Sequence, residues 1–228
     1  MVNTTDHDIG YDVASPRDMN ATPQRGITYR MVFKRLFDVT FTLCLFPVAL
    51  PIVVLSAIAI ALHDGGNPFY RQMRLGRNGR VFSILKLRTM VRDADTRLME
   101  HLRNNPDAAA EWQASQKLRH DPRVTVVGCF LRKTSLDELP QLWNVLTGDM
   151  SLVGPRPMMV TQRHFYSGDA YYKLRPGITG NWQVSARNES EFASRANFDN
   201  AYHDDLSLVT DLQILYRTIG VVFRATGR

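Results

Sequence analysis

Cysteine is scarce in this chain of 228 residues, which contains two. Cys44 lies in an apolar run and Cys129 lies far from it, so the pair lacks the close spacing of a metal site. This low count argues against a disulfide-stabilised secreted fold and fits a reducing compartment.

The first 28 residues lack any apolar periodicity. They are polar and contain Pro16, Pro23, Gly10 and Gly26, a composition that predicts a disordered tail. They also lack the basic start and early apolar core of a secretory signal, so we expect no cleavage there.

Charge is absent from Val39 to Leu62, a run of 24 residues. A helix needs about 20 apolar residues to cross a bilayer core, which disfavours a buried helix of a soluble protein. Pro47 and Pro51 should kink the helix. Both flanks are basic, and basic flanks face the cytoplasm. The flanking cations are Arg30, Lys34 and Arg35 on one side and Arg71, Arg74, Arg77 and Arg80 on the other. We therefore expect residues 29–66 to form a re-entrant membrane helix, with a single transmembrane span as the alternative.

Acidic residues are absent from Asn67 to Arg92, where seven residues are basic. Asn78-Gly79 is typical of a type I′ turn and joins the strand-like runs FYRQMRL and RVFSILKL, which predicts a β-hairpin. The formal net charge of +6 suits an anionic partner, namely phospholipid, phosphorylated substrate or nucleic acid. Most of these cations are expected to lie on lipid headgroups.

Two further regions of the chain have the residue pattern of helices. Residues 91–103 and 108–118 predict a pair of surface helices. A later stripe has helical spacing and predicts a helix packed on the core, or alternatively a helix lying in the membrane interface. The stripe consists of Leu208, Leu212, Leu215, Ile219 and Val222.

The segment from Arg132 to Pro157 reads RKTSLDELPQLWNVLTGDMSLVGPRP. Ser135 and Glu138 have the spacing of a capping box, although Pro140 also allows Asp137 to be the cap. Either arrangement predicts Asp137 and Glu138 at the start of a helix, where free N–H groups favour carboxylates and phosphates. Taken alone, the two acids are better explained as ordinary capping residues, because acidic first turns are common.

Four motifs in a fixed order make the chain resemble the bacterial sugar transferase family, whose members include monotopic phosphoglycosyl transferases. The resemblance extends from about Lys34 to Phe223. It rests on KRLFD at 34–38, KLRTM at 86–90, the segment 121–157 and RPGITGNWQVSARN at 175–188. The chain departs from the family at Leu50, where serine is usual, and at the additional Pro47.

This resemblance implies a mainly helical α+β fold at the bacterial inner membrane. A re-entrant helix, a small β-hairpin and interfacial helices would surround a compact cytoplasmic catalytic domain, residues 67–228. Asp137 would be the nucleophile of a dyad with Glu138, and both would lie near Mg²⁺ or Mn²⁺. The residues implied to bind substrate or phosphate are Lys86, Arg88, Arg132, Pro155, Arg156, Pro157, Arg175 and Arg187.

The implied reaction moves hexose-1-phosphate, from galactose or glucose, from a UDP-sugar to undecaprenyl (polyprenyl) phosphate and releases UMP. It would pass through an aspartyl phosphosugar and begin exopolysaccharide synthesis at the membrane. The alternative is a non-catalytic basic module bound to the membrane, which binds nucleic acid or serves as a scaffold. No recognised nucleic-acid module is present, so the expected partners are UDP-hexose, polyprenyl phosphate and phospholipid, with the oligomeric state left open.

Overall fold

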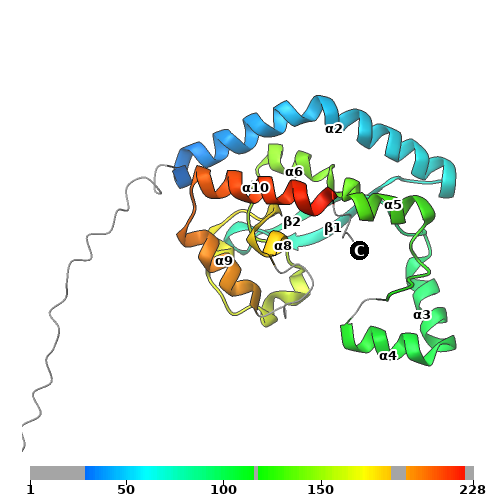
Figure 1. Ribbon diagram of the computed structural model, residues 1–228. Helices are drawn as coiled ribbons and strands as arrows, with labels where there is room; N and C mark the ends of the chain where they lie inside the picture. Colours follow the sequence, from blue (N-terminus) through cyan, green and yellow to red (C-terminus); the bar gives the residue numbers. More distant parts are fainter. Residues whose placement is uncertain (1–28, 116–117, 186–193, 224–228) are drawn as a thin grey trace, which may run out of the picture.

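The computed structural model describes residues 29–115, 118–185 and 194–223. The predicted tail of residues 1–28 and the predicted phosphate ligand Arg187 lie outside these ranges. The described part is mainly helical with two small sheets, which confirms the predicted α+β class. One long helix, α2, lies along one side of the molecule, and the remaining elements lie beneath it (Figure 1).

Helix α2 comprises 31 residues, Lys34–Asp64, and follows a π-helical turn at Tyr29–Phe33. It continues through Pro47 and Pro51, and Figure 1 shows it bowed over the domain. At 1.5 Å per residue it is about 46 Å long. Among the described residues it is the one helix long and apolar enough to cross a membrane. Most of its large apolar side chains are exposed, with Leu62 at 83%, so its outer face has no protein partner within the described chain.

A buried polar network holds the N-terminal end of α2. The Lys34 ammonium lies 3.2 Å from Asp38 and 2.8 Å from Asp211 of α10, and both carboxylates are fully buried. The hydroxyls of Tyr29 and Tyr202 each donate to Asp211 at 2.6 Å. Because buried charges are tolerated only when paired and hydrogen-bonded, this network joins α2 firmly to the C-terminal helices.

The C-terminal end of α2 contacts the same domain. Arg88 forms an ion pair with Asp64 at 3.3 Å, and Gly65 closes the helix with φ of +66°. Ile60 is buried in an apolar cluster with Leu87 and Leu131. Both ends of α2 therefore pack against the same domain.

The predicted hairpin is confirmed. Strands β1 (Phe69–Leu75) and β2 (Val81–Leu87) pair antiparallel along their full length. Asn78 and Gly79 both have positive φ, as a type I′ turn requires, within the short 3₁₀ turn Arg77–Gly79. The free edge of β2 is covered by Asn144, whose amide accepts from the Leu85 N–H at 3.0 Å and donates to the Ser83 carbonyl at 2.9 Å.

A second, parallel pair of strands was not predicted from the sequence. Strands β3 (Ser151–Val153) and β4 (Gly177–Thr179) pair in parallel. The backbones come so close here that a Cβ on Gly154 would lie 2.3 Å from the Arg175 carbonyl oxygen, and one on Gly177 would lie 2.1 Å from the Gly154 nitrogen. Glycine is therefore required at both positions, where the segment 121–157 packs against the segment 175–188.

The predicted capping box is wrong. Ser135 adopts a left-handed conformation (φ +57°) and ends helix α5 (Val126–Thr134), which Thr125 caps by accepting from the Gly128 N–H at 2.9 Å. A 3₁₀ turn, η3 (Leu136–Glu138), follows, and helix α6 (Gln141–Thr147) begins only after Pro140. The reason is geometric: an N-cap residue needs extended backbone, and Ser135 is left-handed.

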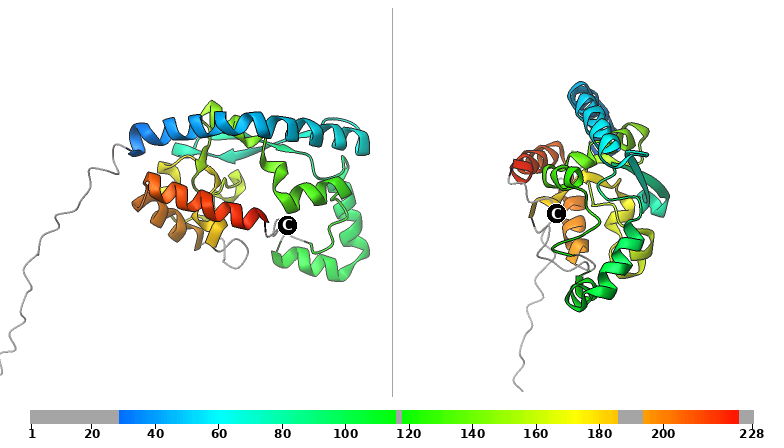
Figure 2. Two further views of the ribbon diagram at one scale, coloured as in Figure 1. Left: turned by 45° about the horizontal axis from the view of Figure 1, so that its top comes forward. Right: turned by 90° about the vertical axis from the view of Figure 1, so that its right-hand side faces the viewer.

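The predicted surface pair is present as α3 (Ala94–Asn104) and α4 (Pro106–Ser115). No residue of α3 is buried, and the pair stands apart from α9 and α10 in Figures 1 and 2. Its attachment includes Arg123, whose guanidinium lies 5.0 Å from the centre of the Trp112 ring and pairs with Asp121 at 2.7 Å.

The remaining elements form the side of the molecule below α2. They are the 3₁₀ segment Val160–Phe165 and helices α7 (Ala170–Lys173), α8 (Asn181–Ser185), α9 (Arg195–Asp204) and α10 (Leu208–Phe223).

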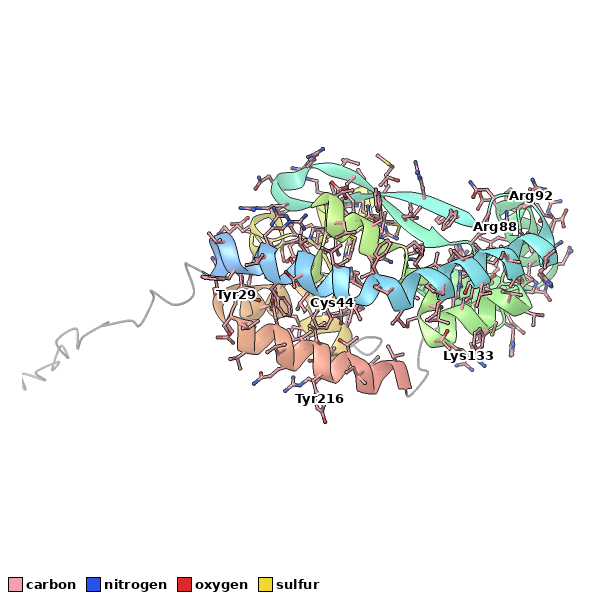
Figure 3. All side chains as sticks on the ribbon, turned by 90° about the horizontal axis from the view of Figure 1, so that it is seen from above. Tyr29, Cys44, Arg88, Arg92, Lys133 and Tyr216 are labelled. Atoms are coloured by element: carbon pink, nitrogen blue, oxygen red, sulfur yellow. The ribbon has the colours of Figure 1, made fainter. Side chains whose placement is uncertain are left out.

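The expectation that the stripe of α10 packs on the core is wrong for four of its five members, because Leu208, Leu212, Ile219 and Val222 are exposed. A narrower side with Asp211 and Ile214 is buried instead. Figure 3 shows α10 running beside α2, with Tyr216 directed away from the molecule.

Candidate active site

The left-handed turn at Ser135 brings Asp137 and Glu138 to the end of strand β2. Helix α5 packs closely against the segment after β2, where the Thr125 N–H donates to the Thr89 carbonyl at 3.1 Å. A Cβ on Gly128 would lie 2.0 Å from the same carbonyl oxygen. This close approach places the two acids within reach of the basic motif KLRTM.

Lys86 and Glu138 form an ion pair at 2.6 Å, and each side chain is about one-fifth exposed, at 21% and 19%. The partial burial strengthens the Coulomb attraction between the two charges relative to a surface ion pair. The structure therefore places Lys86 beside the dyad, where its charge compensates one of two adjacent carboxylates.

The Asp137 carboxyl is strongly perturbed. Burial, and after it the nearby Glu138 charge, raise the pKa of this carboxyl from 3.8 to about 6, while Lys86 and Arg132 act in the opposite direction. Ionising this carboxyl is unfavourable in the free protein. The ionised form is therefore stabilised when a cation or an electrophilic phosphorus atom approaches it.

The dyad fits a divalent metal ion of the Mg²⁺ type. Mg²⁺ is commonly bound through one or two carboxylates together with substrate phosphates. Within the ranges that the structure describes, no third Asp, Glu, His or Cys joins Asp137 and Glu138 in a metal-type cluster. The donor set suits an ion that shares its coordination with a phosphorylated substrate and does not suit a closed structural site.

Arg132 and Arg156 both lie near the dyad. Arg132 donates through Nε to the Thr89 hydroxyl at 2.9 Å, and the Asp137 charge acts on it electrostatically. Burial lowers the pKa of its guanidinium. Arg156 lines a groove together with Glu138. Both cations are thus near an anion held at the dyad.

The loop Pro155-Arg156-Pro157 is fixed by neighbours on both sides. The Gly177 N–H donates to the Pro155 carbonyl at 2.8 Å, and Arg74 of β1 donates to the Pro157 carbonyl at 3.3 Å. Since proline also restricts φ, the backbone around Arg156 is held in place.

Two predicted phosphate ligands lie at helix ends. Arg88 binds the C-terminal end of α2 through Asp64 and the Gly65 carbonyl. Arg175 donates to the Gly148 carbonyl at 3.0 Å, at the C-terminal end of α6. Cations at the carbonyl end of a helix are stabilising, so these contacts account for both arginines structurally.

An apolar groove, lined in part by Glu138, lies beside the dyad. It has a volume of about 340 Å³ and lies between α2, α10 and the turn that carries the dyad. Its walls are aliphatic and aromatic, and the polar side chains Glu138 and Arg156 lie among its lining. Such a groove suits an apolar chain with an anionic head.

Sequence reasoning missed this groove and the role of Arg74. The hairpin arginines Arg71 and Arg74 both look like headgroup contacts in the sequence. The structure distinguishes them because Arg74 lies on the side that meets the Pro155–Pro157 loop. Only the pairing of β1 with Met159 beyond that loop reveals this.

Comparison with known proteins identifies the family to which this chain belongs. Residues 29–225 match the sequence model of bacterial sugar transferases. The exopolysaccharide production protein ExoY of Rhizobium meliloti is 46% identical over 196 residues, which cover 85% of this chain and 87% of that protein.

Two further relatives carry more specific names. The UDP-galactose-lipid carrier transferase of Erwinia amylovora is 47% identical over 85% of this chain, and this chain spans 41% of its length. The UDP-glucose:undecaprenyl-phosphate glucose-1-phosphate transferase of Caulobacter vibrioides is 42% identical over 82% of this chain and 68% of that protein. Because the family model covers most of its length, this chain belongs to the bacterial sugar transferase family.

Proposed function

We propose that this protein transfers hexose-1-phosphate from a UDP-sugar to undecaprenyl phosphate and thereby starts exopolysaccharide synthesis. The observation that carries the proposal is Glu138, which adjoins the buried Asp137, pairs with Lys86 and lines an apolar groove between α2 and α10. The names of the relatives include galactose and glucose transferases, so the donor is UDP-galactose or UDP-glucose.

In the first step, an Oδ of Asp137 attacks the β-phosphorus of the donor. The new Oδ–P bond forms as the bond from phosphorus to the bridging oxygen breaks, and UMP leaves with that electron pair. Dividing one transfer into two displacements is the usual advantage of a carboxylate nucleophile. The ion pair with Lys86 holds Glu138 beside the nucleophile, and the nearby Arg132 and Arg156 would attract the phosphoryl oxygens.

In the second step, a phosphate oxygen of the lipid attacks the aspartyl phosphosugar. The Oδ–P bond breaks, the Asp137 carboxylate is regenerated, and the polyprenyl diphosphate sugar is the product. A bound Mg²⁺ would supply charge neutralisation for the donor diphosphate.

The groove supports this assignment of the acceptor. Its lining from α2 includes Phe41, Leu45 and Val48, and its lining from α10 includes Leu215 and Val222. These side chains would cover part of a polyprenyl chain, while its phosphate would lie near Glu138 and Arg156.

We also propose that α2 inserts into one leaflet and returns, with the catalytic face in the cytoplasm. The contacts of both helix ends with one domain support this, as do the exposed apolar side chains between them. Tags at the two ends of the chain should both be accessible from the cytoplasmic side of sealed vesicles. Access from opposite sides would contradict re-entrance.

The transferase activity can be tested with the purified protein in nanodiscs. UMP release is measured with polyprenyl phosphate, Mg²⁺ and either UDP-galactose or UDP-glucose. Asp137→Asn should abolish release, whereas Asp107→Asn, which alters an exposed acid in α4, should leave it unchanged. With donor alone, mass spectrometry should detect a phosphohexose on Asp137. Full UMP release by Asp137→Asn would refute the assignment, and a protein inactive with both donors would favour the scaffold alternative.

A further inference from the structure

Gln183 is a buried amide in the lining of the apolar groove. It lies in helix α8, which packs against α10, and it is 7% exposed. Neither its Nε2 nor its Oε1 has a hydrogen-bond partner among the described residues. Of those residues, it is the one that both lines the groove and has buried side-chain polar atoms without a partner. A buried amide in this state destabilises the fold, so its position at the groove requires a reason.

The backbone beside Gln183 does not supply the missing hydrogen bonds. A Cβ on Gly180 would lie 2.0 Å from the Gly154 carbonyl oxygen and 2.9 Å from the Gln183 Oε1, so the amide lies close to that carbonyl. No hydrogen bond joins the amide to it. Gln183 therefore does not serve to hold the junction of β3 and β4.

Two other polar side chains in the lining of the groove are already engaged. The Thr218 hydroxyl donates to the Ile214 carbonyl at 2.7 Å, so the contact of 2.7 Å between Thr179 and Thr218 uses the Thr179 hydroxyl as the donor. Both hydroxyl protons are thus used within the protein. The N–H donors and the accepting oxygen of Gln183 are left for another group.

The hydrogen-bonding capacity of an amide restricts the ligand that fits Gln183. A polyprenyl chain offers no hydrogen bond, and an ionised phosphate accepts from Nε2 but leaves Oε1 without a donor. Two adjacent sugar hydroxyls match the amide fully, because one accepts from Nε2 while the other donates to Oε1. A sugar ring is therefore the part of the substrates that suits this side chain.

The position of the groove favours the hexose over the ribose of a UDP-sugar. The hexose is joined through one oxygen to the phosphorus that Asp137 attacks, whereas the ribose is separated from that phosphorus by the second phosphate. Glu138 adjoins Asp137 and lines the same groove as Gln183. The hexose is thus the sugar ring nearer to the amide.

We propose that the Gln183 amide binds two adjacent hydroxyls of the donor hexose and thereby selects the sugar that is transferred. The rotatable bonds of the glutamine side chain let the amide turn toward the ligand. Galactose and glucose differ in the orientation of one hydroxyl, so an amide that spans two neighbouring hydroxyls can distinguish them. This inference rests on the proposed function, because it assumes a UDP-hexose donor and Asp137 as the nucleophile.

Binding measurements on the full chain in nanodiscs test the contact. Gln183→Met keeps the length of the side chain and removes its hydrogen bonds. Calorimetry is performed in the Asp137→Asn background, which prevents turnover. Gln183→Met should weaken the preferred UDP-hexose about tenfold and leave UDP, which lacks the hexose, within twofold. Gln113→Met makes the same exchange at an exposed position of α4 and should bind both ligands like the parent. Equal weakening of UDP and UDP-hexose would assign the amide to the ribose and overturn the proposal.

Thermal stability separates this role from a structural one. Gln183→Met removes a buried amide that has no partner among the described residues, so it should raise the Tm of the ligand-free protein by about 2–4 °C or more. A stabilised protein with weaker sugar binding is the expected trade-off for a binding residue. A lower Tm, together with equal loss of affinity for UDP and UDP-hexose, would show that Gln183 serves the fold.

Donor analogues that each lack one hexose hydroxyl identify the groups that Gln183 contacts. The wild type should lose about tenfold in kcat/KM for UMP release with the analogues that lack a contacted hydroxyl, and Gln183→Met should lose no more with those analogues. Equal losses in both chains for every analogue would overturn the proposal, as would a rise confined to the KM for polyprenyl phosphate. A protein that binds UDP-hexose through Gln183 but releases no UMP would refute the proposed function and still support this site.

Discussion

Replacing Asp137 by asparagine should abolish catalysis and at the same time stabilise the fold at neutral pH. Burial and the Glu138 charge raise the pKa of Asp137 from 3.8 to about 6. Each pKa unit corresponds to about 1.4 kcal/mol, so the ionised carboxylate costs the folded state on the order of 3 kcal/mol above pH 6. Asparagine has nearly the same shape and carries no charge, so the variant avoids this cost.

The direction of the pKa shift determines how this stability cost depends on pH. The pKa in the folded state lies above that of the unfolded chain, so the cost is complete above about pH 6. It declines as the pH falls toward 3.8, because the folded protein then takes up the proton first. About half of the difference between wild type and Asp137→Asn should remain at pH 5.

Thermal unfolding in EDTA at pH 7.5 and pH 5 measures this difference. For a chain of this size about 3 kcal/mol corresponds to about 6–12 °C in Tm. Adding Mg²⁺ should stabilise the wild type and not the variant, because the ion needs the carboxylate. Asp107→Asn should change Tm at neither pH. The reasoning is refuted if Asp137→Asn is no more stable than the wild type at pH 7.5, or if the difference does not shrink at pH 5.

Two further predictions concern the Lys86–Glu138 ion pair and the close approach of β3 and β4. Lys86→Met leaves the partly buried Glu138 without its cation, so it should lower the free energy of unfolding by about 1–3 kcal/mol. It should also move the acid limb of the kcat/KM profile to higher pH, because the Lys86 charge lowers the pKa of Asp137; an unmoved limb would show that Lys86 does not act on the nucleophile. Gly154→Ala should destabilise the protein by about 3 kcal/mol, because its Cβ would lie 2.3 Å from a carbonyl oxygen. Gly220→Ala, whose Cβ meets nothing within 4 Å, is the control, and equal Tm values for the two variants would contradict the close approach of β3 and β4.

The sequence by itself determined the features that depend on local rules. The uncharged run became α2, because only a helix satisfies the backbone of such a segment in an apolar setting. Asn78-Gly79 formed the predicted turn, because these residues tolerate positive φ. The adjacency of Asp137 and Glu138 also follows directly from the chain.

The tertiary structure decided which charges meet. Lys86 reaches Glu138 across 52 residues of sequence, whereas Arg88, two residues further along, binds the end of α2. The raised pKa of Asp137 depends on burial by segments distant in sequence. The left-handed backbone of Ser135 prevents the capping box that local spacing predicted. Coulomb and desolvation energies depend on distances in space, so spacing along the chain could not predict these contacts.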